Sequence, residues 1–194
     1  MKKYLVLVST CFLLSCAATK NYDVVTDDAG SPHYTKKLKD DTKGQSYFPE
    51  TRQVDGKKVF VFDPNLDAWA AYAANGHRLM TGSASGGRDV CPNDAKKSCR
   101  TVIGTFHIYD KKGPDCKSSE YPLSTHGGAK MPYCMHFFEG YAIHAAYDVP
   151  DYNASHGCIR VLPGAAKWLN ERFIDIGTTV VVMPYNHPDK LPLA

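Results

Sequence analysis

Short apolar runs separated by turn residues follow one another along most of this 194-residue chain. Several of them alternate apolar and polar positions, as strands with one buried face do. Asn75-Gly76 separates two such runs, which predicts a tight β-hairpin. The predicted strands cover residues 59–62, 68–73, 77–80, 101–109, 133–138, 140–145 and 178–183.

One segment of this region, residues 163–173, repeats its apolar positions at helical spacing instead. Pro163-Gly164 opens it, and a Gly at position 177 marks the turn that follows. The β-branched run 178–183 is apolar on both faces, which predicts a central strand. Many strands with one main helix predict a mostly β domain, a sandwich or barrel.

The N-terminus has the pattern of an export signal. Met1-Lys2-Lys3 is positively charged, and the apolar stretch after it, which ends at Leu14, is too short to span a bilayer. Leu13-Leu14-Ser15-Cys16 resembles the lipobox of bacterial lipoproteins, which implies cleavage before Cys16 and acylation of that cysteine. An ordinary secretory signal with an accidental cysteine is the alternative. Ala17 resembles the residue found in lipoproteins sent to the outer membrane.

Composition divides the chain into four parts. Residues 1–15 are the expected lipoprotein signal peptide, and the polar residues 16–50 are the expected lipidated N-terminus and flexible tether. The catalytic domain is expected at 51–186, before a short tail at 187–194. The net charge of the whole chain is +3. Without a basic stripe or a known motif, we expect no nucleic-acid partner.

Cysteine usage fits an oxidising compartment. Setting Cys16 aside for lipid and Cys158 for chemistry leaves an even number of cysteines in the mature chain, namely Cys91, Cys99, Cys116 and Cys134. We favour the pairs Cys91–Cys99 and Cys116–Cys134, because Cys91-Pro92 begins a turn that brings its flanks together. The alternatives are buried reduced thiols, or a bridge that includes Cys158.

The candidate catalytic side chains are concentrated in Ser155-His156-Gly157-Cys158-Ile159-Arg160, with His144 upstream. A nearby imidazole can deprotonate a thiol and stabilise the thiolate as an ion pair. Glycine beside the nucleophile allows close approach of a substrate. These residues predict covalent acyl transfer. A zinc site that adds His126 and His136 lacks the usual ligand spacing, so we expect neither metal nor cofactor.

The ordered set of motifs resembles the L,D-transpeptidase catalytic domain of bacterial cell-wall enzymes. Besides the hexapeptide, four further motifs carry the resemblance: the hairpin at Asn75-Gly76, the glycine loop 81–87, the strand Thr101–Phe106 and Gly140-Tyr141-Ala142-Ile143-His144. The resemblance covers roughly residues 58–186. It implies an L,D-transpeptidase-like β-sandwich or barrel with its main helix after the catalytic motif.

The resemblance also implies roles for single residues. Cys158 is the expected nucleophile and His144 its base or ion-pair partner, oriented by the backbone carbonyl of Ala145. His156 is expected to support the site, and the N–H groups of Gly157 and Cys158 to stabilise an oxyanion. The remaining candidates, for substrate binding or structural support, are Ser155, Arg160 and Tyr141.

The implied reaction begins when Cys158 attacks the third residue of a peptidoglycan stem tetrapeptide and expels the terminal D-alanine. The thioester then acylates an amine, giving a 3→3 crosslink or attaching a protein, such as one of the outer membrane, to the wall. Thiolate–imidazolium pairing is expected to make the first step accessible near neutral pH. An L,D-carboxypeptidase and a non-catalytic wall-binding lipoprotein are the alternatives. The expected location is the periplasm of a Gram-negative bacterium, with the lipid in the outer membrane.

Overall fold

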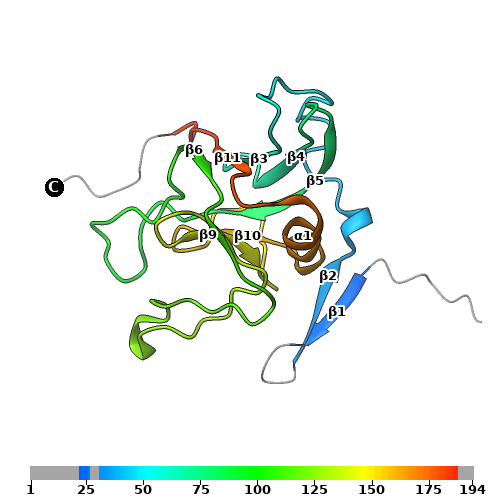
Figure 1. Cartoon of the computed structure of the whole chain (residues 1–194). Helices are drawn as coiled ribbons and strands as arrows, with labels where there is room; N and C mark the ends of the chain where they lie inside the picture. Colours follow the sequence, from blue (N-terminus) through cyan, green and yellow to red (C-terminus); the bar gives the residue numbers. More distant parts are fainter. Residues whose placement is uncertain (1–21, 27–30, 188–194) are drawn as a thin grey trace, which may run out of the picture.

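A computed structural model describes residues 22–26 and 31–187 of the chain. Most strands of this region form one sheet in the order β6-β11-β3-β4-β5-β10-β9-β8-β7 (Figure 1). The strands are β3 Val59–Asp63, β4 Ala68–Tyr72, β5 Arg78–Ser85, β6 Gly104–His107, β7 Asp110–Lys111, β8 Met135–Phe138, β9 Tyr141–Ala145, β10 Ile159–Val161 and β11 Thr179–Val182. The predicted mostly β class is confirmed.

The sheet curls until its two ends approach each other. The ring of Phe106 in β6 lies 5.6 Å from that of Phe137 and 5.2 Å from that of Phe138, both in β8. The helix α1, Pro163–Trp168, packs its buried residues Ala165 and Ala166 into the core enclosed by this half-barrel. The architecture therefore has one curled sheet around one helix.

The strand β3 is buried on both faces, as its continuous apolar run requires. Phe60 and Phe62 belong to the main core with α1, whereas Val59 and Val61 belong to a second cluster with Phe48. β11 lies inside the sheet between β6 and β3, as the sequence predicts for a central strand.

The residues before β3 correct the expected extent of the tether. The carboxylate of Asp41 accepts hydrogen bonds from the backbone N–H of Ser83 at 2.7 Å and from its hydroxyl at 2.9 Å. Phe48 is only 4% exposed. The 3₁₀ turn η1, Leu38–Asp40, leads into this packed stretch. Residues 38–50 are thus part of the domain, because one aromatic and one satisfied carboxylate fix an otherwise polar segment.

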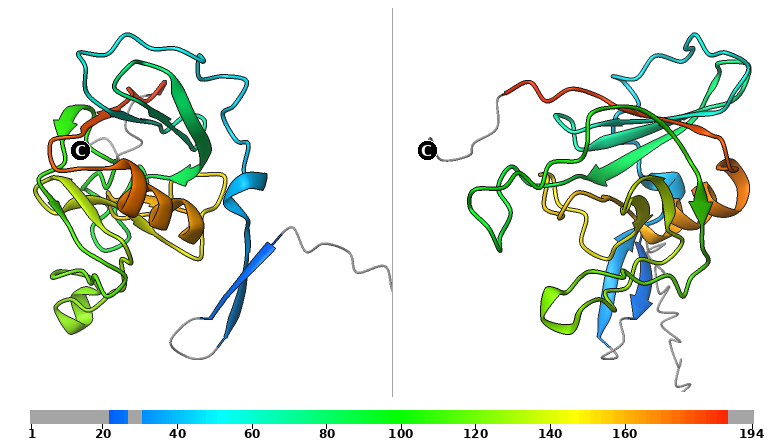
Figure 2. Two further views of the ribbon diagram at one scale, coloured as in Figure 1. Left: turned by 45° about the vertical axis from the view of Figure 1, so that its right-hand side comes forward. Right: turned by 60° about the vertical axis from the view of Figure 1, so that its left-hand side comes forward.

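A second, two-stranded sheet precedes them. β1, Tyr22–Thr26, pairs antiparallel with β2, Pro32–Lys36, and this hairpin projects from the main body in both views of Figure 2. The ring of His33 in β2 stacks on that of Tyr147 at 4.8 Å. The signal peptide, Cys16 and residues 188–194 lie outside the described residues. Across the part of the chain that is described, no helix has the length and apolarity needed to cross a membrane.

Further elements differ from the sequence-based expectation, among them β5, which continues through the predicted glycine loop to Ser85. The strand predicted from residue 101 begins at Gly104, because Thr101 turns its N–H to the hydroxyl of Tyr185 at 3.1 Å. The helix is α-helical only to Trp168 and continues as a π-helical turn, Leu169–Phe173. The short β10 has no counterpart in the prediction.

Candidate active site

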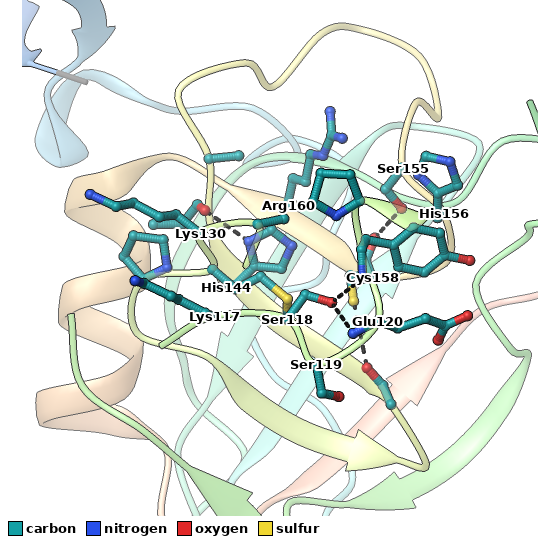
Figure 3. A pocket seen from close by; sticks show the side chains of 18 of the residues that line it. Lys117, Ser118, Ser119, Glu120, Lys130, His144, Ser155, His156, Cys158 and Arg160 are labelled. Atoms are coloured by element: carbon teal, nitrogen blue, oxygen red, sulfur yellow. Dashed lines mark hydrogen bonds between the residues drawn. The ribbon is translucent and has the colours of Figure 1, made fainter. Parts of the chain in front are cut away.

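Cys158 stands directly before β10, which pairs in parallel with β9. The register places Ile159 opposite Ile143 and Arg160 opposite His144. Side chains alternate along a strand, so His144, Arg160 and Cys158 share one face of the sheet. All three line one cavity, and Figure 3 shows them gathered there. Cys158 is the free cysteine of the described residues.

His144 is held by its neighbour in the chain. Its Nδ1 lies 2.8 Å from the carbonyl oxygen of Ala145, the bond that the family resemblance implies. A carbonyl only accepts, so Nδ1 carries the proton and Nε2 is left as the acceptor. The N–H of Ala145 in turn donates to the carbonyl of Pro132 at 2.8 Å. Tautomer and ring position are thereby fixed.

The surroundings of His144 and Cys158 favour the uncharged form of each side chain. Burial lowers the pKa of His144 to about 4, and the neighbouring charge of Arg160 acts in the same direction, while the bond to Ala145 opposes the shift. Burial also raises the pKa of the Cys158 thiol. Both shifts oppose charge separation. Both directions favour a neutral thiol beside a neutral imidazole in the resting site, and they run against the thiolate–imidazolium pair expected from the sequence.

The loop before the nucleophile is tied together by Ser155. Its hydroxyl donates to the carbonyl of Cys158 at 2.6 Å and accepts from the N–H of Gly157 at 2.9 Å. The N–H of Gly157, expected in an oxyanion hole, is thus engaged inside the loop. Ser155 supports the structure of the turn, because one hydroxyl closes it from both ends.

Gly157 and Tyr141 are in close contact. Gly157 has φ +126°, and a Cβ atom built on it would lie 2.5 Å from Cε1 of Tyr141. Glycine is therefore required here both by backbone conformation and by space. The Tyr141 ring packs against the nucleophile loop, and the thiol of Cys158 donates to the nearby carbonyl of Gly140 at 3.8 Å.

His156 points away from His144 and meets a different wall of the cavity (Figure 3). Its ring centroid lies 4.6 Å from that of Tyr121, with the two ring planes tilted by 33°. Burial, followed by the charges of Arg88 and Arg160, lowers the pKa of His156. Arg160 itself is partly buried, and its Nη1 lies 3.9 Å from a carboxylate oxygen of Asp148. It adds a positive charge to the cavity wall.

Residues 113–134, here called the arm, form the outer wall of the cavity. The disulfide Cys116–Cys134 closes the arm, as the sequence predicts. These two cysteines pack with Met131 and Ala142 against Cys158. The arm and the sheet enclose about 1330 Å³, more than a drug-sized ligand needs and enough for several residues of a peptide.

The second predicted disulfide, Cys91–Cys99, is also present and closes a short loop, of which Pro92 and Asn93 line the same cavity. The N–H of Arg88 donates to the carbonyl of Ser155 at 3.1 Å, and its side chain donates to the carbonyl of Ala154. Gly87 packs so tightly that an added Cβ would lie 2.8 Å from Cα of Gly157. Gly87 and Arg88, which precede this loop, therefore hold the nucleophile turn in place.

Comparison with known proteins supplies the family. The model of the L,D-transpeptidase catalytic domain family, YkuD, matches residues 57–182. This chain belongs to the L,D-transpeptidase family. No curated protein sequence matches it.

Solved L,D-transpeptidases share the fold. The enzyme of Xylanimonas cellulosilytica is 26% identical, with TM-score 0.58 over 71% of this chain and 66% of that one. The enzyme of Stackebrandtia nassauensis is 22% identical, with TM-score 0.56 over 72% and 62%. An LD transpeptidase in complex with imipenem is 25% identical, with TM-score 0.54 over 66% and 59%. This chain spans less than two thirds of each of these proteins.

Within this L,D-transpeptidase domain, the structure brings together the predicted Cys158, His144 and Arg160, with Ala145 behind the ring. Gly157 and Ser155 act within the loop, and His156 faces the arm. Sequence reasoning raised Tyr133 as a possible groove residue but missed other lining residues of the arm, among them Tyr121. The cysteine pair was the available signal, since it marks residues 116–134 as a closed loop without showing which wall they form.

Proposed function

We propose that this L,D-transpeptidase acts on peptidoglycan stem tetrapeptides through a thioester on Cys158. The product is a 3→3 crosslink, or a protein attached to the wall when the acceptor amine belongs to a protein. The observation that carries the proposal is the His144 ring, pinned at Nδ1 and sharing one large cavity with the free thiol. The second ring nitrogen is thereby available as a base.

The first half-reaction follows from this geometry. His144 Nε2 accepts the thiol proton as the sulfur of Cys158 attacks the carbonyl of the third stem residue. The N–H of Cys158 is the donor that we assign to the developing oxyanion, since the N–H of Gly157 is bound to Ser155. The C–N bond then breaks, and the protonated His144 gives its proton to the departing amine of D-alanine. A thioester and a neutral imidazole remain.

In the second half-reaction an amine is the nucleophile and the Cys158 sulfur is the leaving group. A neutral amine attacks the thioester carbonyl, and His144 takes a proton from that amine. The tetrahedral intermediate collapses with release of the Cys158 sulfur, which recovers its proton from His144. The new amide and the resting thiol are the products. Water in place of the amine would give a free tripeptide by the same steps.

Location is a further part of the proposal. The charged residues Lys2 and Lys3, the apolar stretch to Leu14 and the cysteine at position 16 support export and acylation. The protein is then periplasmic and anchored by lipid in the outer membrane, in the compartment that contains peptidoglycan. The two disulfides agree with an oxidising compartment.

Product analysis tests the proposal. The purified protein is incubated with disaccharide-tetrapeptide, with and without an added amine acceptor, and the products are weighed by mass spectrometry. A crosslinked dimer or an amine adduct, with release of D-alanine, is the expected result. Free tripeptide as the sole product would make the protein an L,D-carboxypeptidase, and unchanged substrate would contradict enzymatic activity.

A further inference from the structure

Glu120 is held by the arm at the wall of the catalytic cavity. The hydroxyl of Ser118 accepts hydrogen bonds from the backbone N–H of Glu120 at 3.1 Å and from that of Tyr121 at 2.9 Å. The carbonyl of Tyr121 accepts from the N–H of Ala129, in the returning half of the arm, at 2.8 Å. These bonds fix the backbone at Glu120, whose exposed side chain lines the cavity that contains Cys158.

The carboxylate of Glu120 acts on the nucleophile. Burial raises the pKa of the Cys158 thiol, and the negative charge of Glu120 acts in the same direction. The same charge opposes the lowering of the pKa of His156, which burial causes. In the view of Figure 3, Glu120 and His144 lie on opposite sides of Cys158. A negative charge therefore stands near the sulfur, on the side away from the base.

This carboxylate is unfavourable for the free enzyme. A negative charge beside a thiol opposes formation of the thiolate. In the part of the chain that the structure describes, no cation forms an ion pair with Glu120. The hydroxyl of Tyr121, whose pKa is raised by burial and then by the charge of Glu120, is a neutral neighbour and does not offset that charge. A cation that enters the cavity beside the sulfur would offset it.

The stem residue that forms the thioester can bring such a cation. The departing D-alanine lies toward His144, because His144 protonates its amine. The α-carbon and side chain of the third stem residue are on the other side of the reacting carbonyl, which is the side of Glu120. When that residue is diaminopimelate or lysine, its side chain ends in an ammonium group, which is charged at neutral pH.

We propose that Glu120 binds the side-chain ammonium of the third stem residue and so selects stem peptides with a cationic residue at that position. This inference rests on the proposed function and extends it to the side chain that the arm recognises. The contact is a charge-assisted hydrogen bond between ammonium and carboxylate. It also offsets the effect of Glu120 on the thiolate, so the correct substrate favours its own attack by Cys158.

The test compares two tetrapeptides that differ at the end of the third side chain. One has lysine at that position, and the other has norleucine, which lacks the ammonium group. The rate of D-alanine release gives kcat/KM for each peptide. We expect the wild type to favour the lysine peptide about fivefold or more, since a partly exposed charge-assisted contact contributes less than a buried one. Glu120→Gln should lose this preference through slower turnover of the lysine peptide.

Glu139→Gln is the matched control. Glu139 lines the same cavity, and its charge is not among the causes of the pKa shift of Cys158. This variant should keep the wild-type preference for lysine. Acylation by a carbapenem should be at least as fast in Glu120→Gln as in wild type, because a charge that opposes the thiolate has been removed. Slower acylation would show that Glu120 serves the thiol itself, contrary to the inference.

The outcomes separate this inference from the proposed function. Equal turnover of the two peptides by the wild type would overturn the role of Glu120 while the proposed function stands. A lysine preference that persists in Glu120→Gln, or that is lost equally in Glu139→Gln, would have the same meaning. If the wild type releases D-alanine from neither peptide, both the inference and the proposed function are wrong.

Discussion

Arg160 lies directly opposite His144 in the parallel pairing of β10 with β9. A guanidinium beside an imidazole opposes protonation of the ring, and burial opposes it more strongly. His144 is consequently kept neutral across the pH range in which an ordinary imidazole would charge. The base of the proposed reaction is thus available in a slightly acidic medium.

The pH dependence of the reaction should reflect this. Because the pKa of His144 is lowered to about 4, kcat/KM is expected to keep its value from neutral pH down to about pH 5. Rates of tetrapeptide turnover between pH 4 and 8 check this, together with alkylation of Cys158 by iodoacetamide. An acid limb near the ordinary imidazole pKa of about 6.5, or a thiolate already formed at pH 5, would contradict a neutral resting pair.

His144 should also make stability depend on pH. Its folded pKa lies below its unfolded value, so between about pH 6.5 and 4 the unfolded chain binds the extra proton. The free energy of unfolding should therefore fall as the pH falls through that window, by about 3 kcal/mol from this one residue. Denaturant unfolding of wild type and His144→Gln measures the contribution as a difference.

Asp67 has to be separated from this effect. Burial raises its pKa to about 6, so its contribution to stability is lost as the pH rises through the range from about 4 to 6, opposite in sign to that of His144. The comparison of variants cancels it, since Asp67 is present in both. A control substitution at an exposed position, His77→Gln, should leave the dependence of the unfolding free energy on pH unchanged. If the unfolding free energy depends on pH equally in His144→Gln and in wild type, His144 is not the group that causes this dependence.

Ser155→Ala should loosen the nucleophile turn. The substitution removes the hydroxyl that joins the N–H of Gly157 to the carbonyl of Cys158. We expect kcat to fall about tenfold or more with a smaller change in KM, and the free energy of unfolding to fall by roughly 1–3 kcal/mol. Ser155→Thr, which keeps the hydroxyl, should recover part of both. Full activity of Ser155→Ala would show that the turn holds itself without this bond.

The two disulfides should differ in their effect on substrate binding. Cys116→Ala with Cys134→Ala opens a closure of 18 residues in the cavity wall, which is expected to cost about 3 kcal/mol of stability and to raise KM for the tetrapeptide about tenfold. Cys91→Ala with Cys99→Ala opens a closure of only 8 residues, which contributes just Pro92 and Asn93 to the cavity wall, so KM should rise less, within about threefold. Equal KM values in both variants would count against the arm as a binding wall.

The parts of this protein that sequence predicts well are those determined by near neighbours. Asn75-Gly76 makes a hairpin with its adjacent strands, and the strand predicted at 140–145 is β9, Tyr141–Ala145. The hexapeptide around Cys158 predicts covalent acyl transfer from local sequence alone, because a thiol, an imidazole and a glycine lie within a few positions of one another. The even number of remaining cysteines and the turn at Cys91-Pro92 favoured the two disulfide pairs that the structure contains.

The parts that it predicts poorly depend on distant partners. β10 has three residues and exists because β9 and β5 lie on either side of it. The bond of Asp41 to Ser83 spans 42 positions, so nothing local marks residues 38–50 as part of the domain. The pKa shifts of Cys158 and His144 are likewise caused by burial, which the spacing of residues along the sequence does not report.

The central claim is that the Cys158 sulfur carries the acyl group. The most direct measurement is the intact mass of the protein after incubation with a carbapenem, followed by peptide mapping of the adduct. We predict one adduct per chain, located at Cys158, and none in a Cys158→Ala protein that unfolds at the same temperature as wild type. An adduct of the same mass on Cys158→Ala, or on another residue of the wild type, would contradict the account.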